Sequence, residues 1–284
     1  MSMIKAGFIG LGRMGMPMAR SIAAAKLPLT VYDLRPEPLE EMKKLGAKVA
    51  ESCQEVAAKS DAVISMVRDE AETKAVIFGK DGLWEGMKKG GVIIISSTIG
   101  PWYCREVYKK AKEHGVQVVD ACVSKEGSGF EIGGLTLMIG GDDVAVKKCM
   151  PIFKAMGKYI FHLGGIGAGQ LYKLVNNLAG FGCGTVARES LNLGLKAGLD
   201  LQKMIEVMLV STGGSWTLKN MALMMKSGAQ MRPPPGKPMA KHLGNKDKEL
   251  AYELAKEVGA DVTLAKFMDK LEKVYDAYDQ RMKT

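Results

Sequence analysis

A glycine-rich turn near the start of the chain most constrains the fold. The sequence Gly10-Leu-Gly-Arg-Met-Gly15 follows a short apolar run, Ala6–Ile9, and leads into an amphipathic segment that continues to Ala25. In a strand–turn–helix unit, the first glycine permits the tight turn, the second lets the backbone approach a pyrophosphate, and the third lets the helix pack closely. In this context the motif predicts a dinucleotide-binding unit. The turn residues expected to contact the cofactor are Gly10, Leu11, Gly12, Arg13, Met14 and Gly15.

An acidic side chain, Asp33, ends the next apolar run, eighteen residues after Gly15. A carboxylate at this place accepts hydrogen bonds from an adenosine ribose and repels a 2′-phosphate, so NAD is favoured over NADP. Arg35 keeps NADP open as an alternative, because a nearby guanidinium could receive the 2′-phosphate. The competing interpretation is an ordinary glycine turn, with Asp33 as a helix cap.

The alternation of segments predicts an α/β fold. Seven short apolar runs alternate with amphipathic stretches: Ala6–Ile9, Leu29–Asp33, Ala62–Met66, Val92–Ser96, Gln117–Ala121, Leu135–Ile139 and Tyr159–Leu163. Strands separated by helices indicate a mainly parallel, Rossmann-type sheet. We therefore expect a dinucleotide-binding Rossmann domain at 1–163. An all-helical substrate and oligomerisation domain should follow at 164–284, entered by a long helix that starts near residue 169. The proline-rich run Met231–Pro238 predicts a loop.

Composition and charge narrow the classes of function. The chain of 284 residues is 47% apolar and 25% charged, which excludes a disordered or fibrous protein. No apolar run approaches the roughly 20 residues of a membrane-spanning helix, and the N-terminus lacks a secretory signal pattern. We therefore expect a cytoplasmic protein. The net charge is +9, and residues 164–240 hold 8 basic and 3 acidic side chains, which favours a cleft for small anions over nucleic acid. Scattered cysteines and three histidines predict no protein-bound metal.

A second informative segment, Gln170 to Val186, carries one charge, Lys173, in 17 residues. A helix that is apolar nearly all round is normally buried, and a lysine on it is costly unless it has a partner or carries a proton. The residues that helical spacing places near one face are Lys173, Asn176, Asn177, Gly180 and Gly184. This pattern predicts one wall of a pocket. The alternative is a lysine that extends to water at the start of a helix.

Four segments carry motifs of one family. They are Phe8–Ala19, Asp120–Ser124, Gly167–Asn177, and Lys246-Asp247 with Leu250-Ala251. Together they resemble the cofactor, substrate, catalytic and carboxyl-terminal motifs of the β-hydroxyacid dehydrogenases (3-hydroxyisobutyrate dehydrogenase-like), over essentially the whole chain. The resemblance implies an oxidoreductase that transfers a hydride between NAD(P) and a small 3-hydroxy acid or semialdehyde acid. It also implies a homodimer or homotetramer.

The resemblance assigns roles to individual positions. It implies that Lys173 is the general acid/base and that Ser124 binds the substrate carboxylate, with Asn177 and Asp247 also on the substrate side. On the cofactor side it implies contacts from Met66, Val67, Thr98 and Lys246. Lys173 has an ordinary pKa of about 10.4. This pKa must fall toward ~7 to 8 for a base at neutral pH, and burial lowers it.

The chain departs from the family pattern after Ser124. Lys125 and Glu126 stand where the family usually has two glycines. We expect Lys125 to bind the substrate, where it could contact a second anionic group through a charge-assisted bond. Pairing with Glu126 or exposure to water is the alternative.

Two other classes of function stay open from the residues alone. One is a related NADP-dependent reductase, similar to the imine reductases or to 6-phosphogluconate dehydrogenase. The other is a non-catalytic Rossmann module that binds nucleic acid or a partner. Lys173, Asn177 and the lack of a clustered basic tail favour the dehydrogenase.

Overall fold

The computed structural model describes residues 3–125, 131–226 and 243–267. The chain divides into two compact units, Met1–Lys173 and Leu174–Thr284, which we describe separately. The boundary expected from the sequence, between residues 163 and 164, stays a prediction. The proline-rich run Met231–Pro238 lies outside the described residues.

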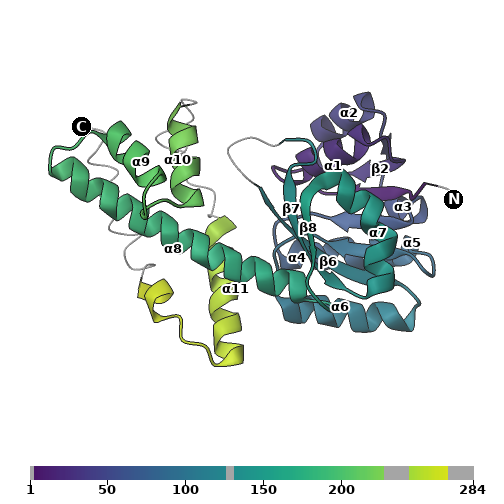
Figure 1. The fold of residues 1–284 in the computed structure, drawn as a ribbon. Coiled ribbons are helices and arrows are strands. Elements are labelled where there is room, and N and C mark those ends of the chain that lie inside the picture. The colour runs from purple at the N-terminus through teal and green to yellow at the C-terminus, as the bar shows by residue number, and fades with distance from the viewer. Residues whose placement is uncertain (1–2, 126–130, 227–242, 268–284) are drawn as a thin grey trace. The chain divides into compact units, whose positions relative to one another are not determined.

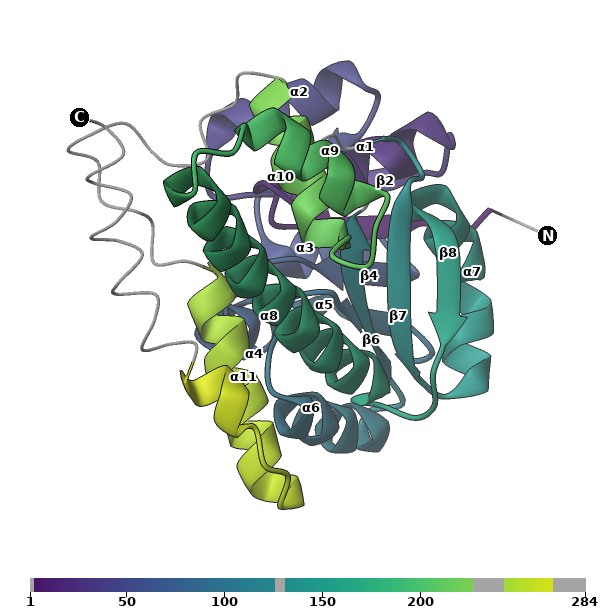
Figure 2. The same cartoon turned by 60° about the vertical axis from the view of Figure 1, so that its left-hand side comes forward.

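An eight-stranded sheet forms the centre of the N-terminal unit (Figures 1 and 2). Its strands are β1 (Ala6–Ile9), β2 (Leu29–Tyr32), β3 (Lys48–Val49), β4 (Ala62–Ser65), β5 (Val92–Ile95), β6 (Gln117–Lys125), β7 (Leu135–Gly141) and β8 (Gly157–His162). Their order is β3-β2-β1-β4-β5-β6-β7-β8. All pairs are parallel except β6 with β7. The predicted Rossmann-type, mainly parallel sheet is thus confirmed.

Seven helices flank this sheet among the described residues. They are α1 (Gly15–Ala24), α2 (Pro36–Lys44), α3 (Cys53–Ala58), α4 (Glu70–Phe78), α5 (Leu83–Gly86), α6 (Pro101–Glu113) and α7 (Asp143–Met156). The local sequence determines where four of these helices start. Ser52 and Asp69 accept hydrogen bonds from backbone amides of α3 and α4, and a proline is the first residue of α2 and of α6.

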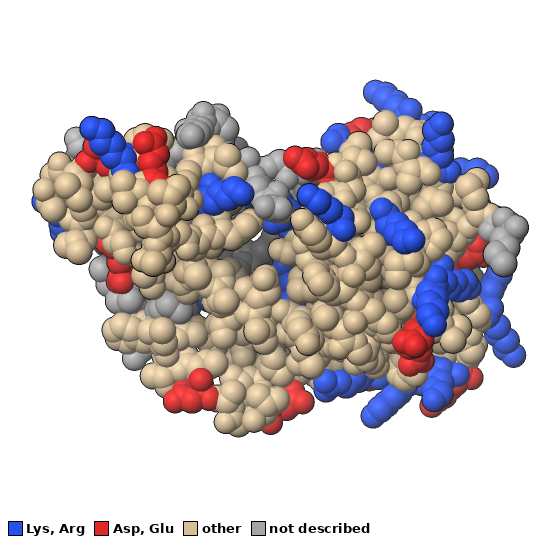
Figure 3. Space-filling view, viewed as in Figure 1, with Lys and Arg blue, Asp and Glu red and all other residues tan. Residues whose placement is uncertain are grey.

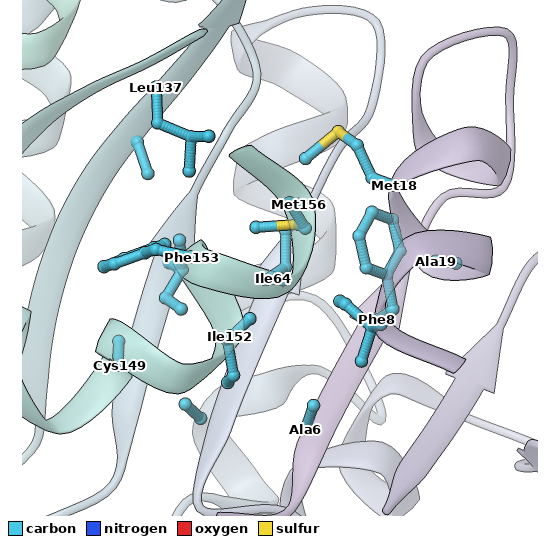
Figure 4. Packing of buried hydrophobic residues seen from close by; sticks show 14 of the residues in the cluster. Ala6, Phe8, Met18, Ala19, Ile64, Leu137, Cys149, Ile152, Phe153 and Met156 are labelled. Atoms are coloured by element: carbon cyan, nitrogen blue, oxygen red, sulfur yellow. The ribbon is translucent and has the colours of Figure 1, made fainter. Parts of the chain in front are cut away.

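Two apolar cores cover the two faces of the sheet, one on each face. On one face, residues of α1, α2 and α7 pack against every second residue of the strands. In Figure 4, Met18 of α1 and Phe153 of α7 lie in this core with the strand residues Phe8 and Ile64. Residues of α3 to α6 pack on the other face, around Ile93. Burial on both faces explains why the central strands read as continuous apolar runs.

The C-terminal unit is helical in its described part, as expected. Helix α8 (Ala168–Lys196) begins in the N-terminal unit and continues past the division, followed by α9 (Leu201–Leu209), α10 (Trp216–Lys226) and α11 (Leu243–Val258). A small core that includes Leu191, Ile205 and Leu218 joins α8, α9 and α10.

The expectation that the long helix is buried nearly all round is wrong. Val175 is 65% exposed and Val186 is 56% exposed. Helix α8 therefore has one buried stripe, with apolar side chains outside it. In the part of the chain that the structure describes, no helix combines the length and the hydropathy needed to cross a bilayer.

Candidate active site

The glycine turn lies between β1 and α1, at the carboxyl edge of the sheet. Gly10 has a φ of +91°, which favours glycine, and its Cα faces the Met66 carbonyl so closely that a Cβ would clash. A Cβ on Gly15 would clash with the Gly10 carbonyl, whereas one on Gly12 would meet nothing within 4 Å. The turn is thus closely packed at Gly10 and Gly15 and open at Gly12, as backbone that approaches a pyrophosphate requires.

Asp33 directly follows β2 and faces the same turn. Its Oδ2 accepts a hydrogen bond from the Leu11 amide at 2.7 Å, and its Oδ1 accepts from the amide and Nε of Arg35 at 2.9 and 3.0 Å. Burial alone would raise the pKa of Asp33, but the hydrogen bonds from Arg35 and Leu11 outweigh it and hold the pKa below its usual 3.8. The carboxylate therefore stays ionised at neutral pH, beside the glycine turn.

Three further residues expected at the cofactor follow the neighbouring strands β4 and β5. Met66 and Val67 come directly after β4, and the Val67 amide donates to the Ser97 Oγ at 2.9 Å. Thr98 follows β5 and is half-buried. Since parallel strands end at the same edge, these residues share the edge of the glycine turn.

Ser124 and Lys125 lie on opposite faces of β6. Lys125 pairs with Leu135 across the antiparallel ladder and shares the face of α1 and α7, whereas Ser124 shares the face of Asp120. Burial, followed by the charge of Arg13, lowers the pKa of Lys125. The charge of Arg13, in the glycine turn, therefore acts on Lys125.

The carboxylate of Asp120 and the side chain of Gln170 join β6 to the start of α8. Asp120 Oδ1 accepts from the Gly167 amide at 2.6 Å, and Oδ2 accepts from the Gln170 amide at 2.8 Å. The Gln170 side chain accepts from the Ile99 amide at 3.1 Å and donates to the Ser97 carbonyl at 2.8 Å. Burial raises the pKa of Asp120 to about 6, although these amides oppose the rise.

Sequence reasoning gave no role to Asp120, Gln170 or Ser97. A weak signal was present, because a carboxylate inside an apolar strand and a glutamine at the start of an apolar helix both need buried partners. Nothing in the spacing showed that they were each other's partners.

Lys173 stands three residues beyond Gln170 on α8, one helical turn along, and is half-buried. It is the last residue of the N-terminal unit. The structure thus brings Lys173 into the unit that holds the glycine turn, Asp33, Thr98 and Ser124.

The remaining predicted residues meet within the C-terminal unit. Asn177 donates from Nδ2 to the Asp247 Oδ2 at 2.7 Å, and Lys246 Nζ lies 3.5 Å from the Asp247 Oδ1. These residues are separated by about seventy positions in the chain, yet α8 and α11 hold them together.

Comparison with known families matches both parts of the chain. Residues 5–164 match the NAD-binding domain of 6-phosphogluconate dehydrogenase, and residues 167–283 match the NAD-binding domain of NADP-dependent 3-hydroxyisobutyrate dehydrogenase. With the glycine turn and Asp33, these matches define the class as nicotinamide-dependent oxidoreductases.

Individual relatives refine this class. The chain is 38% identical to the NAD-dependent L-serine dehydrogenase of Pseudomonas aeruginosa, over 75% of this chain and 71% of that protein. It is 36% identical to the 2-(hydroxymethyl)glutarate dehydrogenase of Eubacterium barkeri, over 76% and 72%. It is also 36% identical to mouse mitochondrial 3-hydroxyisobutyrate dehydrogenase, over 74% of this chain but 63% of that enzyme, slightly under two thirds of its length.

A solved structure agrees with these relatives. The 3-hydroxyisobutyrate dehydrogenase of Salmonella typhimurium superimposes with a TM-score of 0.83 at 27% identity, over 96% of this chain and 95% of that one. The chain belongs to the β-hydroxyacid dehydrogenase family. That membership makes it a hydroxy-acid dehydrogenase with a nicotinamide cofactor.

Proposed function

We propose that the chain oxidises a small 3-hydroxy acid to the semialdehyde acid with NAD, and that Lys173 is the general acid/base. One observation carries the proposal. Lys173 follows, by one helical turn, the side chain of Gln170, which binds the backbone on both sides of Thr98. Lys173, the candidate proton carrier, and Thr98, a candidate cofactor contact, are therefore both linked to the buried side chain of Gln170.

The bound nicotinamide would supply the redox chemistry by accepting the hydride of the carbinol carbon. In the proposed mechanism, Ser124 and the backbone beside it hold the substrate carboxylate. Lys173, in its neutral form, takes the proton of the substrate hydroxyl. Asn177 and Asp247 bind the substrate. In reduction, the Lys173 ammonium returns the proton to the oxygen.

The proposal includes a preference for NAD, set by Asp33. The ionised carboxylate next to the turn would repel a 2′-phosphate and accept a ribose hydroxyl. The guanidinium of Arg35 already contacts Asp33 through Nε and the Leu11 carbonyl through Nη2, at 3.0 and 3.2 Å. A 2′-phosphate would have to compete for Arg35 with these two oxygens.

Lys125 would favour substrates with a second anionic group. Its place on the opposite face from Ser124 means that such a group must extend away from the carboxylate held by Ser124. The relative that acts on 2-(hydroxymethyl)glutarate makes dicarboxylates a sensible class to test. Figure 3 shows basic side chains spread over the visible face of the N-terminal unit, with acidic ones among them.

A substrate panel tests the proposed function. It would contain L-serine, 3-hydroxyisobutyrate, 3-hydroxypropionate and 2-(hydroxymethyl)glutarate, each with NAD and with NADP. Turnover of a 3-hydroxy acid with NAD supports the proposal. Activity on cyclic imines with NADPH, or salt-dependent DNA binding without turnover, would support the alternative classes instead. The cytoplasmic location and the homodimer or homotetramer stay predictions from the sequence.

A further inference from the structure

Four hydrogen bonds, all between buried groups, connect the start of α8 with β6 and with the segment after β5. Asp120 and Gln170 are both 0% exposed, and Ser97 is 1% exposed. Asp120 binds two amides at the start of α8, and Gln170 binds two backbone groups after β5. We call these two residues the Asp120–Gln170 clamp.

The clamp takes the place of an N-terminal cap. Gly167 precedes α8 and has no side chain that could accept a hydrogen bond from the first turn. Asp120 supplies this acceptor from β6. Gly169 makes the close approach feasible, because a Cβ at this position would lie 2.7 Å from the Asp120 Oδ2. The helix start is therefore held against the sheet by a group from another element.

The other half of the clamp reaches the cofactor edge. The side-chain oxygen and nitrogen of Gln170 bind the Ile99 amide and the Ser97 carbonyl, which flank Thr98. The Ser97 hydroxyl in turn accepts from the Val67 amide. A continuous path of hydrogen bonds therefore runs from Asp120 through Gln170 to the backbone around Thr98 and Val67.

We propose that Asp120 and Gln170 are positioning residues, which fix the first turn of α8, and so Lys173, relative to the backbone around Thr98. This inference rests on the proposed acid/base role of Lys173. A displacement of about 1 Å at a reacting group costs on the order of a hundredfold in rate. Loss of the clamp should therefore affect the chemical step more than it affects binding.

Substitution of Gln170 tests the inference. Q170M keeps the side-chain length but removes both hydrogen bonds, whereas Q170E keeps an acceptor for the Ile99 amide. The matched control is T185V, which removes another hydrogen bond on α8, a part-buried one from the Thr185 Oγ1 to the Phe181 carbonyl. For each variant we would measure kcat, KM, the NADH dissociation constant, and the primary deuterium isotope effect with a substrate deuterated at the carbinol carbon.

We expect Q170M to lower kcat about 10- to 100-fold. Its isotope effect should rise, because hydride transfer becomes rate-limiting, while KM changes much less. Q170E should fall between Q170M and the wild type, and T185V should match the wild type in kcat and isotope effect. If kcat in Q170M stays within about twofold and the isotope effect is unchanged, the clamp is only structural and the inference is wrong. If Q170M does not fold, Q170E is judged by the same criterion. Failure of the proposed function looks different: K173A would then retain turnover.

Discussion

At the scale of single residues, the pKa values of two carboxylates, Asp33 directly after β2 and Asp120 within β6, are shifted in opposite directions. Hydrogen bonds from Arg35 and Leu11 overcome burial at Asp33 and lower its pKa. At Asp120, burial dominates and raises the pKa to about 6. Asp33 therefore carries a permanent charge at the cofactor edge, whereas Asp120 changes its protonation within a range that experiments can reach.

Exchange of Asp33 for asparagine should relax the choice between dinucleotides. The variant removes the charge that repels a 2′-phosphate but keeps the shape of the side chain. We expect the ratio of kcat/KM for NAD to that for NADP to fall at least about tenfold, or ~1.4 kcal/mol. The control is D61N, which makes the same change at a carboxylate that accepts the Lys5 amide before β4. A wild-type preference for NADPH would contradict our account of Asp33.

Exchange of Lys173 for alanine should abolish proton transfer and leave the dinucleotide in place. General acid/base groups contribute on the order of 10² to 10⁴ in rate, so kcat should fall by that factor. The NADH dissociation constant, measured by fluorescence, should stay within about threefold. A variant that keeps most of its hydride-transfer rate would remove Lys173 from the mechanism.

Exchange of Lys125 for methionine tests the choice of substrate. Methionine keeps most of the apolar stem and removes the charge. We expect KM for a dicarboxylate such as 2-(hydroxymethyl)glutarate to rise roughly tenfold, and KM for L-serine to change little. An equal effect on both substrates, together with weaker NADH binding, would place Lys125 at the cofactor beside Arg13 instead.

At the scale of elements, the approach of α8 to β6 depends on small residues. A Cβ on Gly169 would lie 2.7 Å from the Asp120 Oδ2 and would also clash with the Met138 carbonyl, whereas one on Gly165 would meet nothing within 4 Å. G169A should therefore destabilise the protein by about 1 to 3 kcal/mol and lower kcat, and G165A should do neither. Urea unfolding and initial rates would check both; equal stability of the two variants would contradict this packing.

Elements were predictable where local patterns determine them. Six of the seven apolar runs became largely buried strands, because strands covered on both faces need continuous apolar sequence, whereas the strand of the last run, β8, is mostly exposed. Strand β3 was missed because it has two residues, both exposed, and carries no such pattern. The exposed Val175 and Val186 show why burial of α8 was wrongly predicted: the sequence gives the polarity of a helix but not the surface that covers it.

At the scale of the whole molecule, Asp120 should leave a signature in the pH dependence of unfolding. Its native pKa of about 6 exceeds the ordinary 3.8, so the folded state binds the proton more tightly. Its favourable contribution is fully present below pH ~4 and is lost as the pH rises to about 6, a change of roughly 3 kcal/mol. The difference in unfolding free energy between wild type and D120N should fall by that amount over this range. A difference that is flat with pH would contradict the raised pKa.

The candidate site was partly predictable. The glycine turn, Asp33 and Lys173 could be named because their patterns are local or match a family motif. The clamp could not, because its four hydrogen bonds join residues from 47 to 73 positions apart, and such pairings depend on the order of strands in the sheet. The contact of Asn177 with Asp247 belongs to the same class.

Gln170 bonds to main-chain atoms of Ser97 and Ile99, not to their side chains. Evolution can therefore replace either side chain without loss of these two bonds, provided that the number of residues between them stays the same. A single insertion or deletion next to Thr98 would break the link at once. In descendants of this chain, loop length at this place should thus be preserved more strictly than residue identity.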